Sequence, residues 1–241
     1  MGFQKLFVYL QFFMVFQLVL CQNDSELPQL QSIFQQKCLK NTGKTESYDK
    51  LSTDVSNLYR DFQNAIEYLQ NDNKLFCNNQ RKLLIETAHK VKSDLKTCLP
   101  DSEKFLAKFF LHSFEELLHF LCHKNGIYSA RFFSNEGQQC RQALEKSQAN
   151  DVDNCLNRIF APTKGYITQT ELCDDIIVAK KCFSRLLDTF CPSANNFKNL
   201  NDIFFNYISN PCSNAFSLLS TNKYLLLLVI MFIHILKSSI L

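Results

Sequence analysis

The sequence predicts an all-α protein, a disulfide-stapled bundle of about six to seven helices. Three observations lead to this prediction: apolar residues recur at helical spacing, no segment shows a convincing strand pattern, and the segment 22–213 contains ten cysteines. The chain is 46% apolar and contains 23 phenylalanines, so it is too apolar and too aromatic to be disordered. Only 5 of its 241 residues are glycine, and no glycine-rich phosphate-binding motif occurs.

The first three expected helices follow from apolar spacing. Residues 47–70 carry apolar side chains at alternating steps of four and three, which predicts an amphipathic helix. Residues 79–98 repeat this spacing, so the two segments are expected to form an antiparallel hairpin joined through residues 71–79. Pro100 opens the next helix, and residues 104–123 are apolar on nearly every face, which predicts a central buried helix.

The second half of the chain predicts three more helices. One is expected from about Gln138 to Ile159. Thr168 and Glu171 form a capping box, and the helix that it opens is expected to run to about Phe190. The last expected helix is Asn199–Ile208. A core of about 190 residues is the size of one domain, although two disulfide-linked helical lobes also fit this length.

Residues 1–21 have the pattern of a secretory signal peptide. Lys5 precedes an apolar stretch that ends at Leu20 and contains no acidic residue, so cleavage is expected after about Cys21. An uncleaved signal anchor is the alternative. The sequence Asn23-Asp-Ser25 is the only N-glycosylation sequon, and Asn23 is a candidate glycosylation site in a secreted chain.

The C-terminal segment 214–241 predicts a membrane anchor. Ser213-Asn-Ala215 supplies small residues, residues 216–223 form a spacer, and residues 224–236 are an apolar tail. This order is the signal for a glycosylphosphatidylinositol (GPI) anchor attached at Ser213. One alternative is a single spanning helix, because the spacer and the tail together are long enough to cross a bilayer, and another is a soluble product.

Ten cysteines in a secreted chain predict five disulfides, since no C-x-x-C pair of a zinc site is present. Cys173, Cys182 and Cys191 are nine residues apart in one expected helix, which places neighbours about 13 Å apart on opposite faces. A disulfide needs Cα atoms within about 7 Å, so each of the three must tie this helix to another element. The connectivity remains open for the ten cysteines, which are Cys38, Cys77, Cys98, Cys122, Cys140, Cys155, Cys173, Cys182, Cys191 and Cys212.

The charges of the core segment balance. Once Lys5, Lys223 and Lys237 are set aside, the segment 22–213 carries 23 basic and 23 acidic residues. A neutral surface provides no long-range field toward nucleic acid or an anionic membrane. We therefore expect no nucleic-acid partner, and membrane contact only through the C-terminal anchor.

Four polar residues form one stripe on the expected central helix: His112, Glu116, His119 and His123. The Glu116/His119 spacing occurs in carboxylate-bridged metal bundles, and the His119/His123 spacing occurs in zinc pairs. The alternative is a polar stripe that faces solvent or a neighbouring helix. We favour the alternative because no second E-x-x-H motif exists, and we expect no metal and no other cofactor.

The 16 phenylalanines of the segment 22–213 allow a pocket for an apolar ligand between helices, lined by Phe109, Phe114, Leu117 and Phe120. Ordinary core packing is the alternative reading of these residues. The cysteines are expected to be committed to disulfides, and no histidine has a local Ser or Asp context of a known catalytic type. We therefore expect no enzymatic activity and no catalytic residues.

Several cysteines stand in characteristic short motifs, which include Cys98-Leu-Pro100, Phe120-Leu-Cys122, Glu136-Gly-Gln-Gln-Cys140, Glu171-Leu-Cys173-Asp-Asp175 and Pro211-Cys212. The order of these cysteines and their flanking residues resembles the insect 27 kDa haemolymph glycoprotein family. The resemblance runs from about Cys38 to Cys212, and it implies a secreted, cysteine-rich, helical protein of an insect body fluid without an assigned enzymatic activity. The sequence departs from the family pattern at 135–139, where a Gly-Gly-Pro-type stretch is usual, and in its apolar tail.

These observations together predict a secreted or cell-surface binding module without catalytic activity. Its expected location is the extracellular space or the outer face of the plasma membrane, and its expected partner is an unidentified extracellular protein. The alternative function is a carrier of a lipophilic small molecule in haemolymph.

Overall fold

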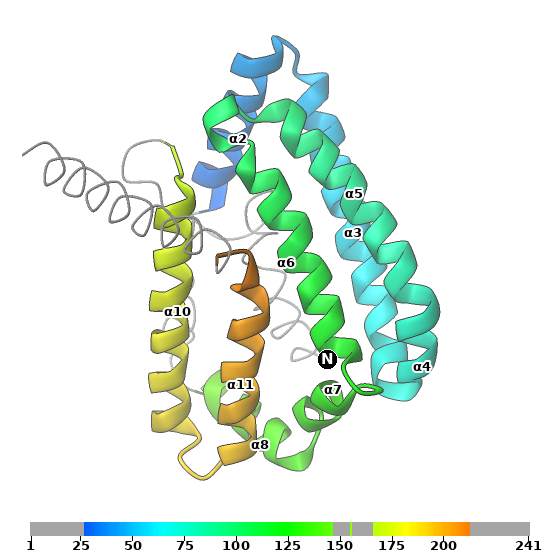
Figure 1. Ribbon diagram of the computed structural model, residues 1–241, viewed down its shortest axis with the longest axis vertical. Coiled ribbons are helices and arrows are strands. Elements are labelled where there is room, and N and C mark those ends of the chain that lie inside the picture. The colour runs from blue at the N-terminus through cyan, green and yellow to red at the C-terminus, as the bar shows by residue number, and fades with distance from the viewer. Residues whose placement is uncertain (1–26, 147–154, 156–165, 213–241) are drawn as a thin grey trace, which may run out of the picture.

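The computed structural model describes residues 27–146, 155 and 166–212, and all regular secondary structure in these residues is helical, with no β-strand. The predicted all-α fold class is therefore confirmed. Figure 1 shows that long helices run along the longest axis of the molecule. Among the described residues, no helix is both long enough and apolar enough to span a bilayer. The expected signal peptide, Asn23, Ser213 and the apolar tail lie outside the described residues.

The described residues form nine α-helices, one π-helical turn and one 3-10 turn, which is more than the six to seven helices expected. The three helices that were not expected are Leu27–Thr42, Asn73–Leu75 and Ile127–Phe132, and the last two are too short for apolar periodicity to reveal. In chain order the elements are α2 (Leu27–Thr42), α3 (Glu46–Asn71), α4 (Asn73–Leu75), η1 (Phe76–Gln80), α5 (Arg81–Cys98), η2 (Asp101–Glu103), α6 (Phe105–Cys122), α7 (Ile127–Phe132), α8 (Asn135–Lys146), α10 (Gln169–Phe190) and α11 (Asn195–Ile208).

The predicted helices agree with the structure where local signals define them. The α3–α5 hairpin and the central helix α6 have nearly the expected bounds, and the Thr168 capping box opens α10. Two starts were predicted too late. Helix α8 begins at Asn135 instead of Gln138, and α11 begins at Asn195 instead of Asn199. Apart from Cys155, which is helical, the expected extension from 147 to 159 lies outside the described residues.

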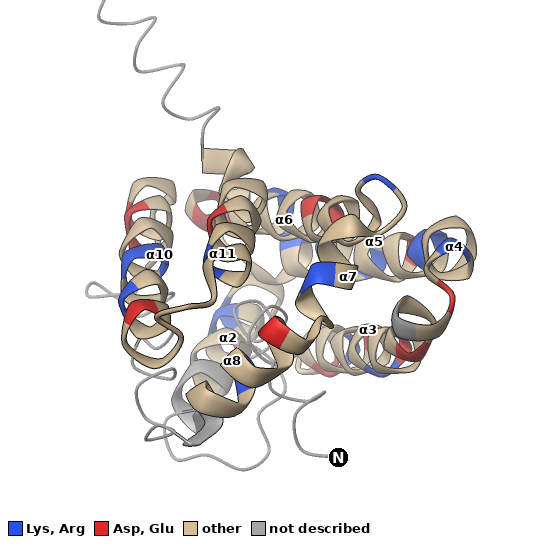
Figure 2. Cartoon of the chain, turned by 90° about the horizontal axis from the view of Figure 1, so that it is seen from below, with Lys and Arg blue, Asp and Glu red and all other residues tan. Residues whose placement is uncertain are grey.

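The long helices form a row in which each contacts the next. Helix α10 packs against α11, α11 against α6, and α6 against α5, and Figure 2 shows this row from below. Helix α3 lies beside α5 and completes the hairpin, while α2 contacts both. Helix α6 therefore occupies the centre of the bundle, as its apolar composition predicts.

Most side chains of α6 are buried, since it has α5 on one side and α11 on the other. Ser113 reaches across this second interface and donates a hydrogen bond to the Ile208 carbonyl at 3.2 Å. Polar residues remain along one narrow stripe of α6 that faces outward. Most of α6 thus belongs to the core of the protein, while its polar stripe is accessible to solvent.

The ten cysteines form five disulfides, which confirms the predicted number. The pairs are Cys38–Cys98, Cys77–Cys122, Cys140–Cys191, Cys155–Cys182 and Cys173–Cys212. Cys173, Cys182 and Cys191 each join α10, or the residue at its end, to a different partner, as helix geometry requires. The first two disulfides connect residues up to Cys122, and the other three connect residues from Cys140 onward. The described disulfides therefore fall into two groups.

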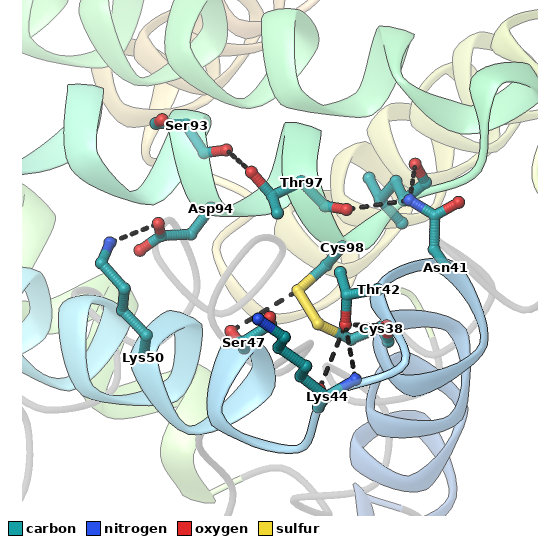
Figure 3. Close-up of a disulfide and its surroundings, with 11 residues drawn as sticks. Cys38, Asn41, Thr42, Lys44, Ser47, Lys50, Ser93, Asp94, Thr97 and Cys98 are labelled. Carbon is teal, nitrogen blue, oxygen red and sulfur yellow. Dashed lines mark hydrogen bonds and ion pairs between the residues drawn. A yellow bond between two sulfur atoms is a disulfide. The ribbon is translucent and has the colours of Figure 1, made fainter.

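The Cys38–Cys98 disulfide lies where α2, α3 and α5 meet (Figure 3). Beside it, the Asn41 amide donates hydrogen bonds to the Thr97 carbonyl at 2.8 Å and to the Leu99 carbonyl at 3.2 Å. Lys50 of α3 forms an ion pair with Asp94 of α5. Burial raises the pKa of the Asp94 carboxyl, although the hydrogen bond from Lys50 acts in the opposite direction.

A buried carboxylate connects three distant parts of the chain. The Glu103 side chain is 0% exposed, and it accepts hydrogen bonds from Lys37 Nζ at 2.6 and 2.8 Å. One of its oxygens also accepts a hydrogen bond from the Ile167 backbone N–H at 2.7 Å. Glu103 thereby joins α2, the connection before α6, and the residue that precedes the capping box of α10.

We expect Glu103→Gln to lower the free energy of unfolding by about 3 kcal/mol, because it leaves the Lys37 ammonium without a countercharge in a largely buried place. The double variant Lys37→Met/Glu103→Gln removes this ammonium and keeps an acceptor for the Ile167 N–H, so it should cost less than Glu103→Gln alone. Urea unfolding followed by circular dichroism measures both. The control Asp101→Asn alters an exposed ion pair and should leave stability unchanged. This account would be contradicted if the double variant lost as much free energy of unfolding as Lys37→Met and Glu103→Gln lose in sum.

A second carboxylate explains the early start of α11. One oxygen of Glu136, in α8, accepts hydrogen bonds from the backbone N–H groups of Asn196 at 2.9 Å and Phe197 at 3.2 Å. The other oxygen accepts one from the Asn196 side chain at 3.0 Å. Glu136 therefore caps the N-terminus of α11 from another helix. The hydrogen bond from the Asn196 side chain is the main cause that lowers the pKa of Glu136, and the two backbone N–H groups add to it.

We expect Glu136→Gln to lower stability at neutral pH by about 1 kcal/mol, the usual cost of losing a helix cap. Because the folded pKa is lowered, the carboxylate stabilises the protein above its ordinary pKa of 4.5, and this contribution is lost as the pH falls through the folded value. The stability difference between the wild type and the variant should therefore shrink in acid. Denaturant unfolding between pH 3 and pH 7 (about the carboxyl range) measures it. The exposed control Asp174→Asn should keep the wild-type profile, and a pH-independent difference would refute the cap.

Candidate recognition surface on α6, α7 and α11

The predicted polar stripe of α6 lies at the surface of the protein. The His119 side chain is 55% exposed and the His112 side chain is 42% exposed, whereas Glu116 between them is only 18% exposed. His123 follows at the end of the helix and is half-buried. The four residues share one face, as the i, i+4, i+7, i+11 spacing predicts, and the face lies next to α11.

Glu116 is the acidic centre of the stripe. Its two oxygens lie 3.7 Å from His112 Nε2 and 3.8 Å from His119 Nδ1. The Asn210 side chain donates a hydrogen bond to Glu116 Oε1 at 2.9 Å. The carboxylate is therefore held by the end of α11 and lies between two imidazole rings that gain an ionic contact when they are protonated.

His123 belongs to an aromatic cluster. Its ring stacks on Tyr128 with centroids 4.7 Å apart and an interplanar angle of 6°. Its Nδ1 lies 3.1 Å from the Tyr207 hydroxyl, and either group can donate, depending on the histidine tautomer. The His119 ring meets the edge of Tyr207 with centroids 5.5 Å apart. Four aromatic rings from three helices are thus in mutual contact.

The cluster rests on Phe120, which is 1% exposed. Its ring centroid lies 5.0 Å from that of Tyr128 and 5.6 Å from those of Tyr207 and Phe204. Partial burial raises the pKa of the Tyr207 phenol, and the nearby Tyr128 and Glu116 add to this shift. Tyr207 is therefore a neutral phenol at physiological pH, able both to donate and to accept a hydrogen bond.

The turn between α6 and α7 sets the position of Tyr128. Lys124, Asn125 and Gly126 all have positive φ angles, of 45°, 59° and 82°, so the chain reverses within three residues. A Cβ atom at Gly126 would lie 2.3 Å from the side-chain nitrogen of Asn73, so only glycine fits here. Because Cys77–Cys122 fastens the end of α6 beside this turn, the stacking of Tyr128 on His123 has a rigid base.

The histidine stripe does not gather into a metal cluster. Within the described residues, no group of three or more His, Cys, Asp or Glu side chains is placed to hold a metal ion together. His123 is engaged with the two tyrosines, and Glu116 with Asn210. The arrangement instead offers aromatic faces, a phenol, two accessible imidazoles and a carboxylate, which suits recognition by stacking and hydrogen bonding.

The four predicted pocket residues are all buried, and two of them have different aromatic neighbours. Phe114 packs toward Phe62 of α3, with ring centroids 6.3 Å apart, whereas Phe120 packs against α11. Phe109 and Leu117 are also buried in the core. A ligand pocket lined by these residues stays a prediction.

Tyr128, Tyr207 and Asn210 were not predicted as site residues. Tyr207 lies 84 residues beyond His123 in the sequence, and the two meet only because α11 packs on α6. The aromatic spacing of Phe120, Tyr128 and Tyr207 has no helical period, since each residue comes from a different helix. The only indication in the sequence was the polar stripe of α6, and the stripe does not reveal which helix packs beside it.

Fold and surface together define a disulfide-stapled helical domain that presents an aromatic and histidine-rich face. The chain belongs to the family described as "Protein of unknown function (DUF1397)", whose model matches residues 24–213. No curated protein and no solved structure matches the chain. The resemblance to insect haemolymph glycoproteins remains an expectation from the sequence.

Proposed function

We propose that the protein is a secreted or cell-surface binding module without catalytic activity. The observation that supports this most directly is the set of five disulfides, because such bonds form and persist in the oxidising environment of the secretory pathway and the cell exterior. The ten cysteines from Cys38 to Cys212 are all consumed in these bonds, so none offers a thiolate for catalysis. Each disulfide typically adds about 2–4 kcal/mol, mainly by constraining the unfolded chain.

The recognition surface in this proposal is the cluster of His112, Glu116, His119, His123, Tyr128 and Tyr207. Tyrosine is enriched at protein interfaces because it combines apolar area with a polar group and few rotatable bonds. Here Tyr128 is also held by stacking on His123 and Phe120, and Tyr207 meets both rings edge-on. A surface that is already ordered loses little entropy when a partner binds.

Surface recognition is favoured over transport of a lipophilic molecule. A carrier needs side chains that face one shared space, yet the ring of Phe114 contacts Phe62 and the ring of Phe120 contacts Phe204, on two different neighbouring helices. The half-exposed rings around His119 are available without any rearrangement of the core. The natural partner in this proposal is an extracellular protein.

The proposal also includes the two ends of the chain. The signal-like residues 1–21 would direct the protein into the secretory pathway, and the C-terminal segment would supply a GPI anchor at Ser213. The resemblance to haemolymph glycoproteins supports an insect extracellular setting. Cells of insect origin are therefore the natural host for testing both ends.

We expect phosphatidylinositol-specific phospholipase C to release the full chain from the surface of intact insect cells, because this enzyme cleaves the lipid from a GPI anchor. Immunoblots of medium and cells before and after treatment measure the release. A Ser213→Pro/Asn214→Pro/Ala215→Pro variant removes the attachment site and should not be retained as a releasable surface protein. Wild-type protein that resists the phospholipase would indicate a spanning helix, and protein free in the medium before treatment would indicate a soluble product.

We expect His119→Ala to weaken saturable binding of the labelled protein to insect cells by about tenfold or more, as for a hot-spot residue. Tyr207→Phe keeps the ring but removes the contact with His123, and should weaken binding less. Lys181→Ala, an exposed change on α10, is the matched control. Flow cytometry over a concentration series measures the apparent Kd. Equal binding by His119→Ala and wild type would exclude this surface.

A further inference from the structure

The neutral core segment separates its charges between neighbouring helices. Helix α3 carries five acidic residues against two basic ones, whereas α5 carries five basic residues against two acidic ones. The two helices lie side by side in the bundle (Figure 2). Formal neutrality therefore conceals an acidic helix and a basic helix, each with its own local field.

Most of the basic residues of α5 lie on one face. The side of α5 toward α3 carries Asp94, which pairs with Lys50, and Thr87, which lies 3.5 Å from Asp61. The side away from α3 carries a row of basic side chains that we call the basic stripe. The basic stripe consists of Lys82, His89, Lys92 and Lys96 of α5 together with Lys108 of α6.

The basic stripe is continuous because α5 and α6 are antiparallel neighbours joined by the short connection 99–104. Lys96 is in the last turn of α5 and Lys108 in the first turn of α6, so both lie at the same end of this pair. The four α5 positions extend along about 21 Å of helix. Lys82, His89, Lys96 and Lys108 are exposed, and Lys92 is half-buried.

Helix α2 brings two more cations to the same end. Asn41 binds the carbonyls of Thr97 and Leu99, and the exposed Lys40 and Lys44 lie on either side of it in the sequence. The carboxylate of Glu103 is buried there with Lys37, so it does not offset this surface charge.

Few acidic groups lie near the basic stripe of α5 and α6. Glu86 lies on the same face of α5, Glu115 lies on the adjoining face of α6, and Asp101 forms an ion pair with Lys104. By contrast, no ion pair involves Lys82, Lys92, Lys96 or Lys108 within the described part of the chain. Gathering like charges without partners costs stability, so an anionic ligand explains the arrangement better than folding does.

Helix stability does not account for the arrangement. A cation in the last turn of a helix is favourable, which explains Lys96. Lys108 occupies the first turn of α6, where the helix dipole disfavours a positive charge. It nevertheless lies at the end of the helix pair where Lys96 also lies, so both belong to the surface that the two helices form.

We propose that the basic stripe binds a sulfated polysaccharide, an inference that rests on the proposed extracellular location. Lysine ammonium groups act as point charges for sulfate, and a linear row fits an extended polyanion. A flat anionic membrane fits a narrow row of basic side chains less well than an extended chain does. Binding is electrostatic and should weaken as salt rises.

Heparin is the probe for this proposal. The full chain, purified from insect cells, should be retained on immobilised heparin at physiological salt. The triple variant Lys92→Gln/Lys96→Gln/Lys108→Gln should lose at least about tenfold in affinity, about 1.4 kcal/mol, measured by titration with a heparin oligosaccharide. The triple variant Lys92→Arg/Lys96→Arg/Lys108→Arg should retain binding, which separates charge from a loss of folding.

The matched control is Lys74→Gln/Lys181→Gln/Arg185→Gln, which removes the same charge from exposed positions elsewhere. An equal loss in this control would show that only net charge matters and would overturn the stripe. No retention of the wild type, or preferential binding to phosphatidylserine vesicles, would overturn the polysaccharide. A dimer that the stripe variant abolishes, without heparin binding, would assign the stripe to a second copy.

The outcome is separable from the proposed function. If the protein reaches the cell surface or the medium but does not bind heparin, this inference fails and the proposed function stands. If the protein is retained inside the cell, the proposed function fails whatever the heparin measurement shows.

Discussion

The hydrogen bonds of the Glu103 carboxylate are the interaction on which the arrangement of the two halves of the chain depends. The first half contains the disulfides up to Cys122, and the second half contains those from Cys140 onward. The Glu103 carboxylate is fully buried, yet it satisfies an ammonium from α2 and a backbone N–H just before α10. No disulfide among the described residues joins the first half of the chain to the second, so this polar contact and the packing of α11 on α6 hold the halves together. A buried carboxylate with good hydrogen bonds is also specific, because any shift of α2 or α10 would leave its partners unsatisfied.

The same division explains where an accessible surface arises. Helix α6 belongs covalently to the first half through Cys77–Cys122, whereas α11 is tied to α10 in the second half through Cys173–Cys212. The rings around His123 and Tyr207 meet at the seam between these two helices. The surface is rigid on each side because disulfides hold each helix, and its polar residues are half-exposed because the seam opens to solvent there.

Features that depend on residues close together in the sequence could be predicted, whereas features that depend on distant residues could not. The spacing of apolar residues in α3 and α5 and the capping box of Thr168 and Glu171 are local, so the sequence was enough to locate those helices. The start of α11 depends on Glu136, which is about 60 residues away in sequence, and no local pattern shows this cap. The polar stripe of α6 was predicted, but Tyr207 and Asn210 were not, because only tertiary packing brings them there. The net charge of the core segment could be counted from the sequence. The separation of acidic residues on α3 from basic residues on α5 depends on which helices are neighbours.

The division of the disulfides into two groups has a consequence for biosynthesis. Cys38, Cys77, Cys98 and Cys122 pair only with one another, so all four are synthesised before Cys140. Both bonds of the first group can close while the ribosome is still translating the second. The number of cysteines competing at one time then falls from ten to four and later six, which reduces the possible pairings from about 945 to about 3 and then about 15. Oxidation of the chain during its synthesis would thus favour the native connectivity before the polypeptide is complete.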